Sequence, residues 1–129
     1  METTTSKKIQ SFRSLKEGWS FGEGVAFQSQ ILHKAIQLIK SAHALGFDET
    51  DAFPGINGEV MVTLYAGQDY WEFTIEADES VTFVYEAGDE TRVYEEGLPF
   101  EFAVSMITNI GMQKNMLILR KSALAEVAA

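Results

Sequence analysis

The hydrophobic period of the sequence changes once along the chain, and this change constrains the fold more than any other feature. From Phe27 to Leu45 the apolar residues recur every three or four positions, which is the spacing of one face of an α-helix. From Val60 to Tyr94 they alternate with polar residues, as in half-buried β-strands. A helix and strands that each have one apolar face can bury those faces against each other. The sequence therefore predicts an α+β domain.

The strand region divides into three alternating runs and a fourth, shorter run. Turn-forming residues at 66–69, 77–80 and 87–90 separate the runs, which predicts an antiparallel meander of three to four strands packed on the amphipathic helix. The inward residues are Val60, Val62, Leu64, Trp71, Phe73, Ile75, Val81, Phe83 and Tyr85. The outward residues form a mixed, acidic face that includes tyrosines; they are Met61, Thr63, Tyr65, Tyr70, Glu72, Thr74, Glu76, Thr82, Val84 and Glu86.

The two ends of the chain have weaker patterns. Residues 1–10 are polar and are predicted to form a flexible N-terminus, followed by a single domain over residues 11–111. Pro99 suits the first position of a second, C-terminal helix, and we expect Gly111 to end that helix. Residues 112–129 fit either a last strand or a helix.

Acidic residues are concentrated in the strand region. Residues 69–101 contain eleven acids and one base, Arg92, whereas the rest of the chain contains eight acids and nine bases. Nucleic acid binding is disfavoured, because this region lacks the cations that would replace phosphate counterions. The acids would attract a basic protein partner, or they serve only to keep a small sheet solvated.

Composition narrows the class of protein further. The chain has 129 residues, enough for one hydrophobic core, and 46% of them are hydrophobic. No apolar run approaches the ~18 residues of a membrane span, and the first ten residues lack the apolar segment of a signal peptide. Cysteine is absent, which excludes disulfides and fits a reducing compartment. We therefore expect a cytoplasmic protein with no membrane partner.

The segment GWSFGEG, residues 18–24, could be a ligand-binding loop or an aromatic plug. A phosphate-binding loop usually follows a strand and has a lysine nearby, whereas no strand is predicted here and Glu23 would repel phosphate. We expect Trp19 and Phe21 either to pack on their own domain or to stay exposed as anchors for a partner.

Catalytic and metal-binding patterns are weak. His33 and His43 lie ten residues apart, which is not the spacing of a zinc pair on a helix, and the acids of residues 48–51 lack the calcium-loop pattern. Closely spaced carboxylates on the outward face could act as an acid and base pair, but alternation places some polar residues there in any half-buried sheet. We predict no enzyme, no metal site and no cofactor.

Fourteen residues follow a pattern found in a known group: Leu15, Gly18, Trp19, Gly22, Lys34, Ala35, Leu38, Pro54, Gly58, Glu72, Ile75, Ser80, Val81 and Phe83. Over about residues 15–86 the chain resembles a widespread group of small uncharacterised bacterial proteins. These have a Trp/Gly loop, a helix and antiparallel strands. The resemblance implies an α+β domain that is often encoded near mobile or toxin–antitoxin-like loci, and it implies no catalytic residue.

These observations favour a non-enzymatic protein-interaction or regulatory module whose acidic surface meets a basic partner. The outward face is less polar than a solvated sheet needs, so self-association as a homodimer is a further expectation. A small-ligand-binding domain with a pocket between helix and sheet is the alternative. The candidate interaction residues are Trp19, Phe21, Tyr65, Tyr70, Glu72, Glu76 and Glu86.

Overall fold

The computed structural model describes the backbone of residues 3–128 and the side chains of residues 3–115. It is an α+β domain, as predicted, but it has five strands and three α-helices, whereas the sequence predicted three to four strands and two helices. The elements in chain order are α1 (Thr4–Ser11), the short 3₁₀ helix η1 (Phe12–Ser14), α2 (Ser29–Ala44), β1 (Glu49–Pro54), β2 (Val60–Ala66), β3 (Asp69–Ile75), β4 (Val81–Ala87), β5 (Glu90–Leu98) and α3 (Phe100–Ala128).

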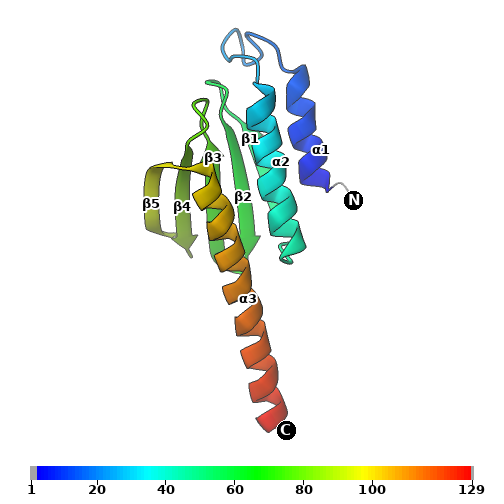
Figure 1. Ribbon diagram of the computed structural model, residues 1–129, viewed down its shortest axis with the longest axis vertical. Coiled ribbons are helices and arrows are strands. Elements are labelled where there is room, and N and C mark those ends of the chain that lie inside the picture. The colour runs from blue at the N-terminus through cyan, green and yellow to red at the C-terminus, as the bar shows by residue number, and fades with distance from the viewer. Residues whose placement is uncertain (1–2, 129) are drawn as a thin grey trace.

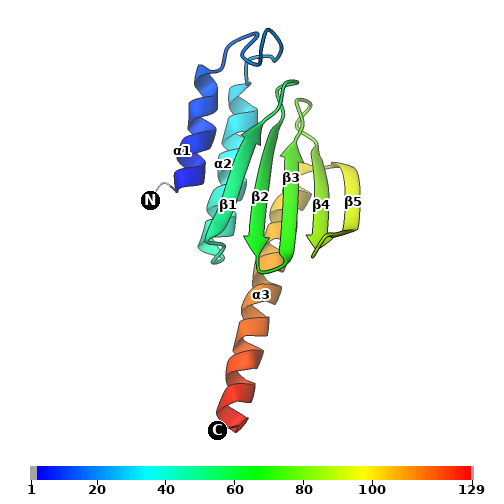
Figure 2. The same cartoon turned by 180° about the vertical axis from the view of Figure 1, so that it is seen from behind.

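The five strands form one antiparallel sheet in the order β1-β2-β3-β4-β5. All three α-helices lie on the same side of this sheet, and no helix within residues 3–128 covers the other side (Figures 1 and 2). The molecule therefore has two layers and one bare sheet face. Within the described residues, no helix combines the length and apolar composition that crossing a bilayer requires.

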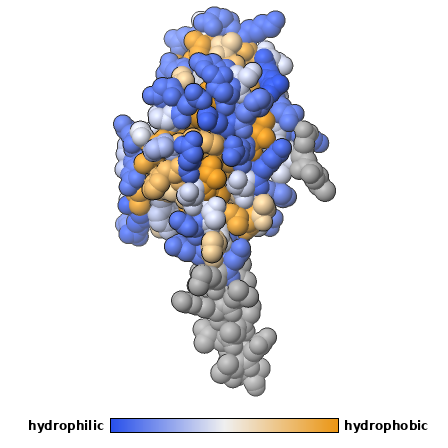
Figure 3. Space-filling model, in the orientation of Figure 1, coloured by the Kyte–Doolittle hydropathy of each residue, from blue (hydrophilic) through white to orange (hydrophobic). Residues whose placement is uncertain are grey.

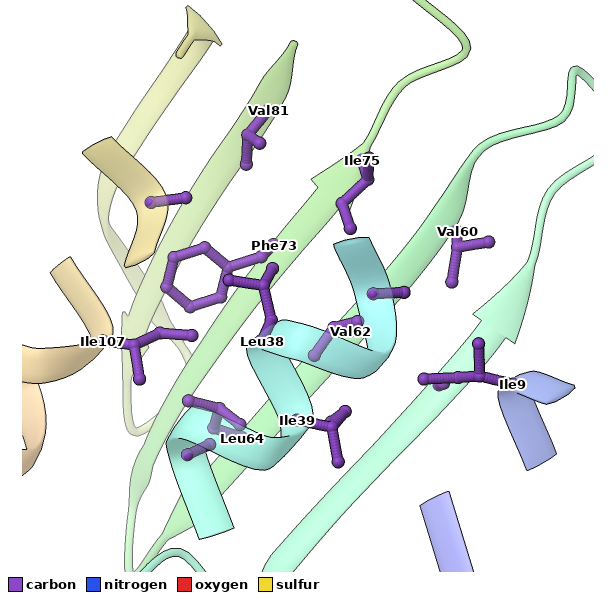
Figure 4. Packing of buried hydrophobic residues seen from close by; sticks show 14 of the residues in the cluster. Ile9, Leu38, Ile39, Val60, Val62, Leu64, Phe73, Ile75, Val81 and Ile107 are labelled. Atoms are coloured by element: carbon purple, nitrogen blue, oxygen red, sulfur yellow. The ribbon is translucent and has the colours of Figure 1, made fainter. Parts of the chain in front are cut away.

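The core lies between the helices and the inward face of the sheet (Figure 4). The predicted inward residues Val60, Phe73 and Val81 are fully buried, as is Leu38 on α2. Of the nine predicted inward residues, all are buried except Tyr85, which is half-buried and packs at the margin of the cluster. The alternation of the sequence thus predicted the inward face correctly, because one buried face imposes a period of two on each strand.

Strand β1 was not predicted, since its sequence ETDAFP reads as part of a loop. Only Ala52 is fully buried there, and it lies opposite Val62 of β2. An edge strand needs few buried side chains, because its backbone pairing with β2 supplies much of what holds it in place.

The prediction of a flexible N-terminus is wrong for residues 4–10, which belong to helix α1. Ser6 donates its backbone N–H to Thr3 Oγ1 at 2.9 Å, which caps the helix, and Ile9 is fully buried. The Thr5 hydroxyl donates to the Thr50 carbonyl at 3.1 Å, and Lys8 pairs with Asp51 at 2.7 Å. Helix α1 is thus held both by the burial of Ile9 and by polar contacts with β1, and no local pattern of apolar residues could indicate those polar contacts.

The prediction that Gly111 ends the second helix is also wrong, because α3 runs through it to Ala128. Phe100, Ala103 and Ile107 share the buried side of α3, and Gly111 continues that side one turn further. A Cβ atom at Gly111 would lie 2.8 Å from Cβ of Leu45, just after α2. This glycine therefore permits a close helix approach and is not a stop signal.

The close approach of α3 to Leu45 predicts that Gly111→Ala changes the stability in the direction opposite to that expected from helix propensity. Glycine to alanine inside a helix normally stabilises it by about 1 kcal/mol. Here we expect Gly111→Ala to lower the free energy of unfolding by roughly 1–3 kcal/mol, because the new methyl overpacks against Leu45. Chemical denaturation measures the change, with Ser105→Ala at an exposed position of α3 as the control. A stabilised Gly111→Ala protein would show that α3 does not approach Leu45 closely.

Candidate functional site

The uncovered side of the sheet is the main candidate site, and we call it the open face (Figure 2). Its residues alternate with those of the core along each strand and pair across the strands. They include Asp51, Phe53, Met61, Thr63, Tyr65, Tyr70, Glu72, Thr74, Glu76, Thr82, Val84, Glu86, Tyr94 and Glu96. Five of the seven predicted interaction residues are among them, so the structure brings together Tyr65, Tyr70, Glu72, Glu76 and Glu86 on one surface.

Tyrosines and glutamates form hydrogen-bonded pairs on this face. The Tyr70 hydroxyl donates to Glu72 at 2.7 Å, and its ring lies 5.3 Å from the ring of Tyr65, centroid to centroid. Partial burial, followed by the bond to Glu72 and its charge, raises the pKa of Tyr70 far above its ordinary value. Tyr94 makes the same kind of bond to Glu96, at 2.6 Å. These bonds fix the rings beside carboxylates and keep the phenols protonated.

Glu76 lies in a shallow hollow of about 680 Å³ at the other end of the open face. Burial, and then the negative charges of Glu59, Asp78 and Glu96, raise the pKa of Glu76. Among the side chains that the structure describes, no cation pairs with Glu72, Glu76, Glu86 or Glu96 within 4.0 Å; the ion pairs formed there are Lys8–Asp51, Lys34–Glu79 and Arg92–Glu90. The open face thus has mutually repelling carboxylates.

A buried hydroxyl without a partner lies in the middle of the open face. Thr63 is fully buried, and its Oγ1 has no hydrogen-bond partner. The residues opposite it on the neighbouring strands are Asp51 and Glu72. A buried polar atom left unpaired costs free energy. The alternation of the sequence predicts that Thr63 lies on this face, but it does not indicate that the residue is buried.

The two aromatic residues of the GWSFGEG loop do not join the open face. The loop lies beyond the ends of α1 and α2 (Figures 1 and 2). Trp19 is half-buried, donates Nε1–H to the Val25 carbonyl at 3.1 Å and lies 6.0 Å from the Phe27 ring. Phe21 is fully exposed at 105% and has a positive φ of 54°. Trp19 therefore closes its own loop, whereas only Phe21 is presented to solvent.

A second hollow lies on the helix side, between α3 and strands β3 to β5, and we call it the α3 groove. It has a volume of about 490 Å³. The walls are mostly apolar, from Ala66, Trp71, Phe83, Tyr85, Val93, Met106 and Ile110, with Asp69, Asn109, Gln113 and Lys114 at polar positions. The sequence predicted a pocket between helix and sheet only in general terms. The residues that line this groove could not be predicted, because the second helix was expected to end at Gly111, before Gln113.

The charged groups of the α3 groove are already engaged. Asp69 accepts a hydrogen bond from the Tyr85 hydroxyl at 2.8 Å. Lys114 Nζ donates to the Gly46 carbonyl at 2.8 Å and lies 4.8 Å from the centroid of the Phe47 ring. What the groove offers a ligand is therefore chiefly apolar surface around the Trp71 and Tyr85 rings, which stack with centroids 5.7 Å apart.

Comparison with protein-family models, with curated proteins and with solved structures found no match. Among the described residues, no group of three or more His, Cys, Asp and Glu side chains is arranged to hold a metal ion. The resemblance noted in the sequence stays a prediction, and the site must be interpreted from its own chemistry.

The raised pKa of Glu76 predicts a pH-dependent stability. An acid whose pKa is higher in the folded than in the unfolded chain is destabilising once ionised, so its effect appears as the pH rises through the folded pKa. Glu76→Gln should raise the free energy of unfolding at pH 7 by up to about 1 kcal/mol, and the gain should vanish below about pH 4. Denaturation across this pH range measures it. The control is Glu95→Gln, opposite Phe83, where no such gain is expected.

The unpaired hydroxyl of Thr63 gives a second stability prediction. Thr63→Val keeps the branched shape but removes the buried oxygen, so we expect the free energy of unfolding to rise by about 1 kcal/mol. The same substitution at half-buried Thr82 on the open face is the matched control. A loss of stability in Thr63→Val alone would mean that the hydroxyl has a partner in solution.

Proposed function

We propose that the protein is a non-enzymatic interaction module and that its open face binds a basic surface of another protein. The observation that carries this proposal is the row of carboxylates on an uncovered sheet that form no ion pair with the described cations. Glu72, Glu76 and Glu86 project from the same face as Tyr65 and Tyr70. The cysteine-free composition supports placing this interaction in a reducing compartment.

Electrostatics supports a cationic partner. Burial, and then the negative charges of its neighbours, raise the pKa of Glu76, so a positive group brought to the hollow would relieve the repulsion as well as form new ion pairs. Opposite charge also speeds the encounter between two proteins. A nucleic acid would instead add its own negative charge to this surface.

The tyrosines supply the apolar part of the same surface. Tyr65, Tyr70 and Tyr94 present rings whose hydroxyl groups are held or placed beside carboxylates, and Phe53 and Met61 extend the surface toward β1. Tyrosine is enriched among residues that dominate binding energy at protein interfaces. Lysine and arginine from a partner could contact both the rings and the carboxylates.

A small-ligand-binding function is the second candidate, and the α3 groove is the observation in its favour. Its volume lies within the range of small-molecule sites. Such sites usually pair apolar walls with a few converging polar groups, but Asp69 and Lys114 already bond within the protein. We therefore rank this function below protein binding.

Charge reversal with a matched control tests the proposal. The triple variant Glu72→Lys, Glu76→Lys, Glu86→Lys changes the net charge from −9 to −3, since each reversal adds two positive charges. A protein captured from the native host by the tagged chain would be purified and titrated against both forms. We expect the variant to bind it at least about tenfold more weakly, the equivalent of ~1.4 kcal/mol.

The control carries the same change of net charge away from the open face, at three exposed acids. It is Glu23→Lys, Asp48→Lys, Glu101→Lys, and it should bind like the unmodified chain. Circular dichroism checks that both variants fold. Equal loss of binding in the two triple variants would reveal only a long-range charge effect, and unchanged binding in both would contradict the proposed site.

A further inference from the structure

Helix α3 is much longer than the part of it that packs on the domain. Its 29 residues span ~43 Å. Residues 100–114 lie over the sheet and end with the bond from Lys114 to the Gly46 carbonyl. Residues 115–128 continue past the edge of the domain (Figures 1 and 2). We call residues 115–128 the projecting half of α3.

The sequence of the projecting half is unsuited to a solvated helix. Nine of its fourteen residues are apolar, namely Met116, Leu117, Ile118, Leu119, Ala123, Leu124, Ala125, Val127 and Ala128. A short helix gains most of its stability in water from packing an apolar side against another surface. A partner surface is therefore needed along about four turns of helix.

Unfilled apolar surface lies directly beside the packed half of the same helix. The α3 groove runs along Met106, Asn109, Ile110 and Gln113, with the sheet as its other wall. The helix-side view shows apolar surface next to this part of α3 (Figure 3). A helical segment that continues past the domain and an apolar groove thus occur on the same molecule, end to end along one helix axis.

We propose that the two surfaces are covered by a second copy of the chain in an antiparallel α3–α3 homodimer. In this arrangement the projecting half of each copy lies in the α3 groove of the other. The lengths agree, because residues 115–128 number fourteen and residues 100–114 number fifteen, so full overlap centres the pair near Lys114. A parallel pair would leave both grooves open. The interface is the same patch on both copies and closes as a dimer.

The character of the two surfaces also favours a second copy as the occupant. The projecting half is mostly apolar, with Arg120, Lys121 and Glu126 as its charged residues. The groove is mostly apolar as well, and its two charged residues, Asp69 and Lys114, are already bonded within the domain. Because the open face takes no part, this inference is independent of the proposed function.

Light scattering on the full chain is the first test, with twice the chain mass expected at micromolar concentration. Leu117 and Leu124 are seven residues apart and share one side of the helix, so Leu117→Glu, Leu124→Glu should yield a monomer. Ser122→Glu, about 140° around the helix from Leu117, is the control and should stay dimeric. A monomeric unmodified chain would overturn the proposal and leave the groove to a small ligand.

Disulfide cross-linking tests the helix direction without disturbing the fold, because the native chain contains no cysteine. Four variants each carry one cysteine, at residue 112, 113, 114 or 115, so that together they cover every side of one helical turn near the centre of the antiparallel pair. Four further variants, with one cysteine at residue 125, 126, 127 or 128, cover every side of a turn near the end of the helix. We expect cross-linked dimer from at least one position of the first set and none from the second. Cross-linking in both sets would indicate a parallel pair, and cross-linking in neither would exclude the α3 interface.

Discussion

The packing of α2 against the inward face of the sheet is the contact on which the rest of the structure depends. Ile31, Leu32, Ala35, Leu38, Ile39 and Ala42 are all fully buried along one side of this helix. Helices α1 and α3 pack on either side of α2, so all helices lie on one face of the sheet. No other element of the described chain covers the second face, so the open face is a direct consequence of this two-layer arrangement.

Two features of the open face lower the stability of the fold, as expected of a surface that is not optimised for stability alone. Glu76 is partly buried beside like charges, which together raise its pKa, and the buried hydroxyl of Thr63 has no hydrogen-bond partner. Such local conflicts tend to occur where a protein surface serves a function. The proposed basic partner would offset the first conflict, because ion pairs would replace carboxylate repulsion.

The two proposed interfaces lie on opposite sides of the sheet and depend on different kinds of interaction. The open face combines carboxylates with tyrosine rings, which suits a polar partner whose binding depends on salt. The α3 groove is apolar, with the charges of Asp69 and Lys114 already bonded inside the domain. A dimer through α3 would leave both open faces accessible, so one assembly could present two copies of the same binding surface.

The sequence alone determined the parts of the fold in which one buried side imposes a period. This holds for α2, for strands β2 to β4, and for the inward or outward orientation of Phe73 and Glu72. The tertiary structure decided the parts held by contacts between distant residues: α1, which binds β1 through Thr5 and Lys8, and the passage of α3 through Gly111 beside Leu45. It also separated Trp19 from the tyrosines and left the hydroxyl of Thr63 buried. Local periodicity indicates which side of a helix or strand is buried. Which other element buries that side depends on contacts between residues far apart in the sequence, and these are present only in the tertiary structure.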